Sequence, residues 1–201
     1  MKLCHVIFRG PAIADAALLE RLPGAYSGIL QQINGFIAFN GGFHLRGVCR
    51  LPEWHSLSVV WSGDYALHKL FPAVEETDIP FGQDCLGDQY LLRDDVVHRL
   101  YGESGFLRSM EMSLVAFLSE VESDATELLG LEPLARFEQE GGRLLPGQLL
   151  SVCPPFITEE SKHGVSLNAV ATLDRIAFLA DFASQMATVR NGAKVEISIA
   201  E

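Results

Sequence analysis

Apolar side chains at helical spacing occur near both ends of the chain. One stripe, after the break at Pro23-Gly24, consists of Tyr26, Ile29, Leu30 and Ile33. Another, near the C-terminus, consists of Ile176, Leu179, Ala180, Ala183, Met186 and Ala187. Steps of three and four residues place each set on one face of an α-helix. We therefore predict an amphipathic helix in each region, the first ending in a left-handed cap at Asn34-Gly35.

Three further segments have weaker helical patterns. Residues 13–22 and 134–140 predict short helices. A third stripe follows Ser104 and consists of Met110, Leu114, Phe117, Leu118 and Val121. Its spacing predicts a helix that begins soon after the turn at Gly102 to Gly105.

The middle of the chain favours strands. Short apolar runs at 57–61 and 79–81 are typical of buried strands, and 88–92 and 96–100 flank a hairpin loop at Arg93-Asp94-Asp95. Residues 3–8 and 148–153 are further strand candidates. Residues 194–199 alternate strictly between polar and apolar side chains, which predicts a last strand.

The order of these elements, helices first, strands in the middle and helices again, indicates an α+β fold. We expect a central antiparallel or mixed sheet flanked by N-terminal and C-terminal helices. A length of 201 residues, with 48% hydrophobic and 20% charged residues, predicts a single globular domain.

Charge narrows the range of partners. Twenty-six acidic residues against fifteen basic ones give a formal net charge of −11. Such a surface repels nucleic acids and anionic membranes, and favours small molecules, cations or a basic protein.

Much of this excess lies in two stretches without Lys or Arg. Residues 70–92 carry Glu75, Glu76, Asp78, Asp84 and Asp88, and residues 109–135 carry Glu111, Glu120, Glu122, Asp124, Glu127 and Glu132. Each stretch is either a solvated face or a docking surface for a basic protein.

The cysteines and the N-terminus indicate an intracellular protein. Cys4, Cys49, Cys85 and Cys153 contain no C-x-x-C pair, so we expect mostly buried free thiols. The apolar stretch at the N-terminus is broken by His5, and no run of 18 apolar residues occurs. We expect a cytoplasmic protein that does not bind membranes.

The segment 79–92 is the main candidate for chemistry, because common phosphate-loop, hydrolase and metalloprotease motifs are missing. Its glycines, Gly82 and Gly87, permit positive φ. Asp84 and Asp88 either cap backbone amides in a turn or form a carboxylate pair for a divalent cation. His44 and His55 lie in an irregular region where the two side chains can converge. We expect no cofactor and no bound metal.

Several short motifs resemble the SUKH superfamily of fungal cell-wall-synthesis regulators and bacterial toxin-immunity proteins. They are Leu22-Pro23-x-x-Tyr26, Ile33-Asn34-Gly35, Ile79-Pro80-Phe81-Gly82 and Gly87-Asp88-Gln89-Tyr90-Leu91-Leu92. The resemblance covers a core of about residues 20–125 and leaves about 126–201 as a C-terminal α/β extension. The sequence departs from the family where Phe36 follows Asn34-Gly35, since a double glycine often stands there in the family.

This resemblance implies a non-enzymatic protein-binding module. In the bacterial branch, it implies an immunity protein that binds a cognate toxin, and an acidic surface would suit a basic toxin domain. Our candidate partner-binding residues are Glu75, Glu76, Asp78, Gln83, Asp84 and Asp88, and Tyr90 is either an aromatic anchor or a core residue.

Two alternatives remain open at this point. One is a regulatory scaffold for endogenous proteins, as in the fungal branch. The other is a metal-assisted hydrolase that uses Asp84 and Asp88 together with His44 or His55.

Overall fold

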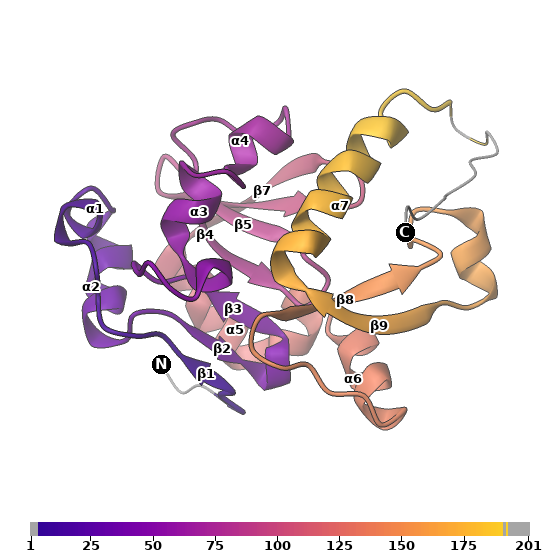
Figure 1. Cartoon of the computed structure of the whole chain (residues 1–201), viewed down its shortest axis with the longest axis horizontal. Helices are drawn as coiled ribbons and strands as arrows, with labels where there is room; N and C mark the ends of the chain where they lie inside the picture. The colour runs from indigo at the N-terminus through magenta and orange to yellow at the C-terminus, as the bar shows by residue number, and fades with distance from the viewer. Residues whose placement is uncertain (1–3, 191, 193–201) are drawn as a thin grey trace.

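A meander of antiparallel strands forms the centre of the molecule (Figure 1). The computed structural model describes residues 4–190 and 192. Within these residues, seven strands lie in chain order in one sheet: β1 (Phe8–Arg9), β2 (Phe36–Ala38), β3 (Phe43–Leu45), β4 (Ile79–Asp84), β5 (Gln89–Arg93), β6 (Val96–Tyr101) and β7 (Phe106–Ser113). Every neighbouring pair is antiparallel, so the α+β prediction is confirmed and a mixed sheet is excluded for the described strands.

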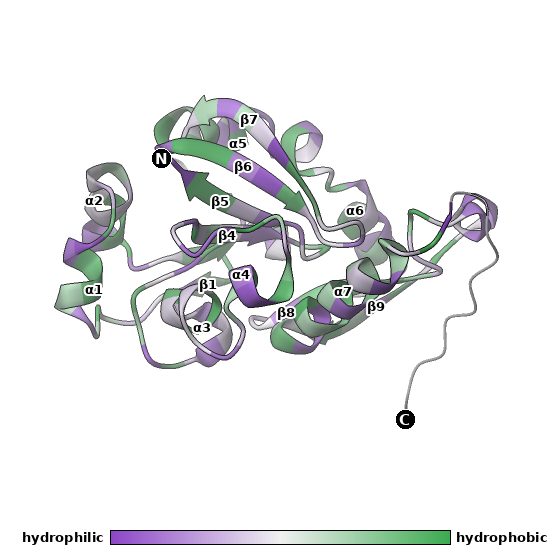
Figure 2. Ribbon diagram, turned by 90° about the horizontal axis from the view of Figure 1, so that it is seen from above, coloured by the Kyte–Doolittle hydropathy of each residue, from purple (hydrophilic) through white to green (hydrophobic). Residues whose placement is uncertain are grey.

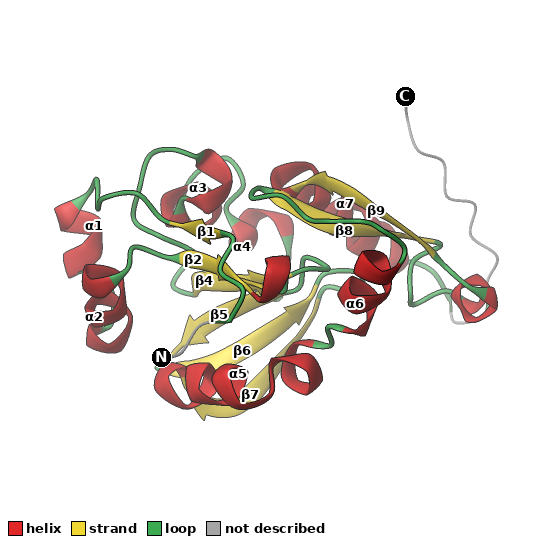
Figure 3. Ribbon diagram, turned by 90° about the horizontal axis from the view of Figure 1, so that it is seen from below, coloured by secondary structure: helices red, strands yellow, loops and turns green. Residues whose placement is uncertain are grey.

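Successive side chains along a strand point to opposite faces of the sheet, so apolar side chains project from both faces. Helices cover each of these faces (Figure 3). In β5, part of whose ribbon is hydrophobic green in Figure 2, Tyr90 and Leu92 enter one core while Leu91 enters the other. The first core includes α2 (Gly24–Gln32) and α5 (Leu114–Leu129). The second is covered by α3 (Leu57–Trp61), α4 (Leu67–Leu70) and α7 (Thr172–Met186).

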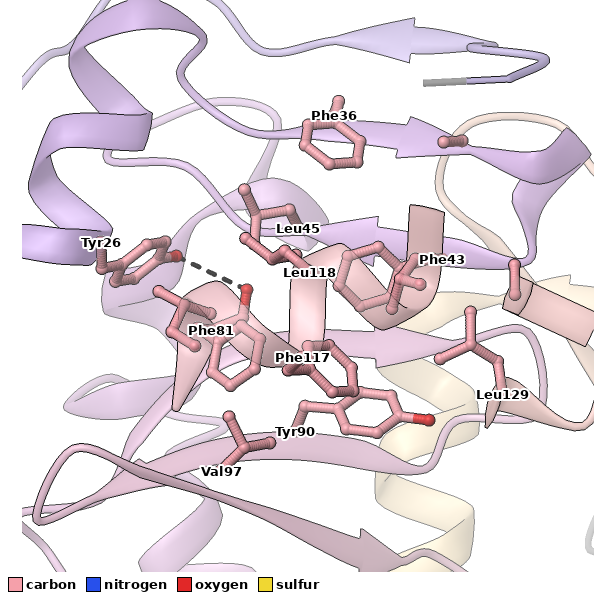
Figure 4. Packing of buried hydrophobic residues seen from close by; sticks show 14 of the residues in the cluster. Tyr26, Phe36, Phe43, Leu45, Phe81, Tyr90, Val97, Phe117, Leu118 and Leu129 are labelled. Carbon is pink, nitrogen blue, oxygen red and sulfur yellow. Dashed lines mark hydrogen bonds between the residues drawn. The ribbon is translucent and has the colours of Figure 1, made fainter. Parts of the chain in front are cut away.

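The larger core is rich in aromatic rings (Figure 4). Tyr90 is fully buried and lies 4.8 Å, centroid to centroid, from Phe117 of α5. The Tyr26 hydroxyl of α2 donates a 2.7 Å hydrogen bond to the backbone oxygen of Arg46 and a 3.5 Å bond to that of Phe81. Tyr90 is therefore a core residue, the second of its two predicted roles.

The C-terminal extension adds a second layer beside the sheet. It contains α6 (Glu132–Gln139) and a hairpin of β8 (Gln148–Cys153) and β9 (Ser166–Ala171), followed by α7. The amide of Leu150 donates a 2.7 Å hydrogen bond to the oxygen of Cys85, at the end of β4. The predicted boundary at residue 126 falls inside α5, so core and extension share that helix.

Smaller elements complete the chain. They are α1 (Ala16–Glu20) and three 3₁₀ turns, η1 (Phe39–Gly41), η2 (Glu53–His55) and η3 (Glu159–His163). Cys49 and Cys85 are buried and Cys4 and Cys153 are exposed, all as free thiols, so the prediction of burial holds for half of them. Among the described residues, no helix has the length and apolar character needed to span a bilayer.

Several predicted elements differ from the structure. Residues 57–61 form helix α3, whose buried Leu57 and Val60 are three positions apart; a five-residue apolar run fits either a strand or a helix. Residues 106–113 belong to β7, so the predicted helix begins only at Leu114.

Near the N-terminus, α2 ends at Gln32 with Ile33 extended, and the positive φ of 79° occurs later, at Gly35. The first strand is confined to Phe8–Arg9, while β2, β3 and β9 were not predicted. The strand predicted at 194–199 lies outside the described residues.

Candidate functional site

A pocket of about 370 Å³ lies where the β6–β7 turn meets the C-terminal extension. Four segments that are far apart in the sequence form its walls. They contribute Leu86 and Asp88 from the β4–β5 turn, Tyr101, Glu103, Ser104 and Phe106 from the β6–β7 hairpin, Phe156 and Ile157 after β8, and Arg175 from α7. The pocket therefore exists only because the extension folds back onto the sheet.

Glycines allow the two sheet turns to approach α7. Gly87 has φ +97°, and a Cβ atom at this position would lie 2.7 Å from Cδ1 of Leu179. A Cβ atom at Gly102 would lie at the same distance from the same atom. The amide of Gly102 also donates a 2.8 Å hydrogen bond to Oδ1 of Asp88, which joins the two turns.

Arg175 is the buried cation of this pocket. Its Nε donates to the oxygen of Leu86 at 3.3 Å, and its Nη2 lies 3.9 Å from Oε1 of Glu103. No described residue accepts a hydrogen bond from Nη1, although that atom is buried. Burial lowers the pKa of Arg175 and the Glu103 carboxylate opposes this effect, yet a guanidinium stays charged. One donor atom of Arg175 is thus buried inside the fold without an acceptor.

Glu103 fixes the loop that follows β8. Its Oε2 accepts a 3.1 Å hydrogen bond from the amide of Ile157, and burial raises the pKa of this carboxyl. The loop presents two large apolar side chains beside Phe106 of β7. Exposed fractions are 60% for Phe106, 43% for Phe156 and 48% for Ile157. We call these three residues the apolar rim.

The structure brings the carboxylates of Asp84 and Asp88 together. Of the two predicted roles, Asp84 has that of capping the backbone amides of the turn. Oδ1 of Asp84 accepts hydrogen bonds from the amides of Leu86, Gly87 and Asp88 at 3.0–3.1 Å. Arg99 bridges the two carboxylates, with Nη2 at 3.0 Å from Asp84 and 2.9 Å from Asp88. Burial, with the nearby Asp88, raises the pKa of Asp84, while Arg99 and the amides oppose this. Of the pair, Asp88 alone lines the pocket.

The other predicted acidic residues lie elsewhere. Asp78 is buried and accepts two hydrogen bonds from Arg93, at 2.7 and 2.6 Å. Glu75 is exposed and lies 3.1 Å from Arg93, and Glu76 is exposed. The prediction of one accessible acidic surface is therefore wrong for Asp78 and Asp84, whose charges are neutralised inside the fold by Arg93 and Arg99.

Gln83 belongs to a series of buried, hydrogen-bonded polar side chains and does not lie on the protein surface. Its Oε1 accepts a 2.5 Å hydrogen bond from Nη2 of Arg46, and its Nε2 lies 3.3 Å from Nδ1 of His44. His44 and His55 do converge, with Nε2 of the first 2.8 Å from Nδ1 of the second. Burial lowers the pKa of both imidazoles, that of His55 to about 4. Gln83 is 1% exposed, so its predicted partner-binding role is also wrong.

The side chains that the hydrolase alternative requires are engaged in contacts within the fold. The two carboxylates bind Arg99 and backbone amides, and the two histidines bind each other. In the part of the chain that the structure describes, no group of three His, Cys, Asp or Glu side chains is placed to hold a metal ion.

The second acidic stretch is the accessible one. On α5, the exposed acidic residues are Glu120, Glu122, Asp124 and Glu127. Asp124 interrupts the helix with φ −146°, and its Oδ1 accepts a 3.0 Å hydrogen bond from the amide of Glu127. A negative face therefore follows the solvent side of α5.

The pocket residues were not identified from the sequence. One signal was present: Arg175 lies four positions before Leu179, on the apolar stripe of the C-terminal helix, where a charged residue is unusual. Glu103, Phe106, Phe156 and Ile157 carry no local signal, because only tertiary folding brings them together.

No family model and no curated protein matches this chain. A matching solved structure is the crystal structure of Atu4351 from Agrobacterium tumefaciens, whose sequence is 15% identical to this chain. The match covers 87% of this chain and 85% of that chain, with a TM-score of 0.50. At this identity the similarity shows a shared fold.

Proposed function

We propose that this chain is a non-enzymatic protein-binding module, an immunity protein that binds and neutralises a cognate bacterial toxin. The observation that carries the proposal is the apolar rim. Three large apolar side chains, from two segments about 50 residues apart in the sequence, stand exposed around one pocket. Exposed apolar side chains that gather around one pocket are typical of protein interaction sites.

Charge supports a basic partner. The net charge is −11, and the exposed acids of α5 add a negative face to the surface. A toxin that acts on nucleic acid must attract phosphates, so its functional surface is positive. An acidic inhibitor would be steered to that surface. The resemblance of residues 20–125 to the SUKH superfamily supports the same class of partner.

Co-expression tests this function directly. The chain is produced together with the toxin domain encoded next to it, and growth and complex formation by size-exclusion chromatography are measured. We expect wild type to restore growth and form a complex. A Phe106→Ala/Phe156→Ala variant should lose both, since it removes most of the apolar rim.

A Leu51→Ala/Val115→Ala variant is the matched control, because these two side chains are exposed and apolar but do not line the pocket. The control should behave as wild type. Failure of wild type to bind the toxin domain, together with recovery of several endogenous proteins on affinity capture, would favour the scaffold alternative instead.

A further inference from the structure

We propose that the His44–His55 pair is an acid-sensitive switch: uptake of a proton by the pair releases residues 4–15 from the sheet, while β2 to β7 stay folded. Residues 4–15, here called the N-terminal segment, contain β1, the strand at one edge of the sheet (Figure 1). Release would leave β2 as the edge strand, with its backbone groups free to pair with another chain. The switch is independent of the proposed function, since it involves neither the pocket nor the apolar rim.

The N-terminal segment is held less firmly than the strands beside it. Each of residues 4–15 is exposed or half-buried, whereas every residue of β2 and β3 is buried. β1 pairs with β2 through only two residues. Further backbone hydrogen bonds of 2.9–3.0 Å connect the segment to β2 and its flanking loops: Ile7 to Ile37, Gly10 to Gly35 and Ala14 to Val48. A segment with so few buried groups opens at a lower free energy than the rest of the sheet.

The imidazole of His55 connects this segment to the fold, because it lies between three glycines from separate parts of the chain. A Cβ atom at Gly10 would lie 2.5 Å from its Nε2, one at Gly35 2.5 Å from its Cε1, and one at Gly47 2.6 Å from its Nε2. The ring of Phe8 in β1 covers the imidazole, with the two centroids 4.9 Å apart. The N-terminal segment therefore contacts His55 at both Phe8 and Gly10, and a change at this ring acts directly on the segment.

Each ring nitrogen of the histidine pair already has a partner that suits the neutral form. Nε2 of His55 donates to the backbone oxygen of Asn34 at 2.8 Å, so its Nδ1 accepts from Nε2 of His44, also at 2.8 Å. Nδ1 of His44 accepts from Nε2 of Gln83 at 3.3 Å. The Gln83 amide cannot turn to offer its oxygen instead, because Nη2 of Arg46 donates to that oxygen at 2.5 Å. A proton added to either ring thus costs the closed structure a buried hydrogen bond.

The surrounding groups do not stabilise a charged imidazole. Burial lowers the pKa of both rings, and the buried Arg46 cation of β3 adds to this effect. Among the described residues, the other contacts of the two rings are uncharged: Phe8 of β1, Trp54 of η2, the backbone of Asn34 and Gln83 of β4. The charged residues next to Phe8 and Trp54 in the sequence, Arg9 and Glu53, are exposed. A protonated ring is therefore more stable in water, and opening of the N-terminal segment brings water to it.

Hydrogen exchange measured by mass spectrometry tests the switch. Protection factors, corrected for the intrinsic exchange rate at each pH, are compared from pH 7 to 4.5 for two peptides, one covering residues 4–15 and one covering β5 and β6. We expect protection of the first peptide to fall by about tenfold or more, since the open form binds the proton more tightly. The second peptide should keep its protection. Equal losses in both peptides, or no loss in the first, would overturn the proposal.

His55→Gln separates the switch from a purely structural role, because it removes the titrating ring and keeps an amide that can donate to Asn34. Protection of residues 4–15 in this variant should change by less than about threefold over the same pH range. His98→Gln is the matched control, since His98 is half-buried on β6, which four strands separate from β1. The control should respond to pH as wild type does.

A pH response of His55→Gln equal to that of wild type would contradict the proposal. If this variant does not fold, as judged by circular dichroism, the two wild-type peptides decide the question. Loss of protection in residues 4–15 at a higher pH than in β5 and β6 supports the switch, and loss of both at one pH overturns it.

Discussion

Two buried histidines form the centre of a hydrogen-bond chain that fixes their protonation. His55 Nε2 lies 2.8 Å from the backbone oxygen of Asn34, which can only accept. His55 Nδ1 must therefore accept from His44 Nε2, and His44 Nδ1 from the amide nitrogen of Gln83. Each imidazole carries one proton and is neutral. Burial lowers the pKa of both rings, and the nearby Arg46 cation adds to this effect. A second proton on either ring would also face a donor.

This arrangement predicts acid sensitivity. The pKa of His55 falls from the ordinary 6.5 to about 4, so the unfolded chain binds more protons than the folded chain between these values. Stability from this residue is complete above pH about 6.5 and is lost as pH falls toward 4, by up to about 3 kcal/mol. The measurement is the free energy of urea unfolding across this pH range.

A His55→Gln variant isolates this contribution. Asp84 acts in the opposite direction, because its raised pKa makes the folded chain bind the extra proton as pH falls. That effect is common to both proteins and cancels in the comparison. We expect the variant to be less stable at pH 7 and to lose less stability on acidification. Parallel pH profiles would contradict the assigned protonation.

At the scale of elements, the close approach of the two sheet turns to α7 positions the pocket. Gly87 combines a positive φ with a missing Cβ that would otherwise meet Leu179. The same helix places Arg175 one turn before Leu179, so a displacement at Gly87 also moves the buried cation of the pocket.

Gly87→Ala should therefore destabilise the fold by about 2–4 kcal/mol, through strain at positive φ and overpacking against Leu179. Gly141→Ala is the matched control, since Gly141 has φ +88° but no atom within 4 Å of its missing Cβ. It should cost only about 1–2 kcal/mol, from strain alone. Urea unfolding of both variants measures the difference, and equal losses would show that contact with α7 is unimportant.

At the scale of the whole molecule, the negatively charged side chains differ in location, some within the fold and some on its surface. Asp78, Asp84 and Asp88 pair with arginines, and Glu120, Asp124 and Glu127 of α5 are exposed to solvent. Long-range attraction of a basic partner depends on exposed charge, since ion pairs within the fold cancel at a distance.

The association rate with the toxin domain should thus fall by about tenfold between about 0.05 and 0.5 M salt. Glu120→Gln/Glu127→Gln should slow association at low salt more than Glu75→Gln/Glu76→Gln, although both pairs remove two charges. Stopped-flow kinetics gives these rates. The reverse order would place the docking surface near Glu75 and Glu76.

Much of the architecture was accessible to sequence reasoning because it depends on local periodicity. The strand at 148–153, the hairpin at Arg93-Asp94-Asp95 and the stripe of α7 are set by spacing and turn residues within a few positions. Prediction failed at β2, β3 and β9, short strands of three to six residues whose pairing partners decide their conformation. It also failed at α3, where five apolar residues do not distinguish a helix from a strand.

The candidate site shows the same difference between features set by local sequence and features set by tertiary contacts. The sequence by itself determined the α+β class and the net charge, and it placed Asp84 in a turn with two possible roles. The hydrogen bonds of the fold decided that Asp84 caps the amides of that turn. Tertiary structure alone decided that Asp78 and Gln83 are buried, and that Glu103, Ile157 and Arg175 meet. The physical reason is that burial and ion pairing depend on which segments pack together, and those contacts span up to 89 residues here.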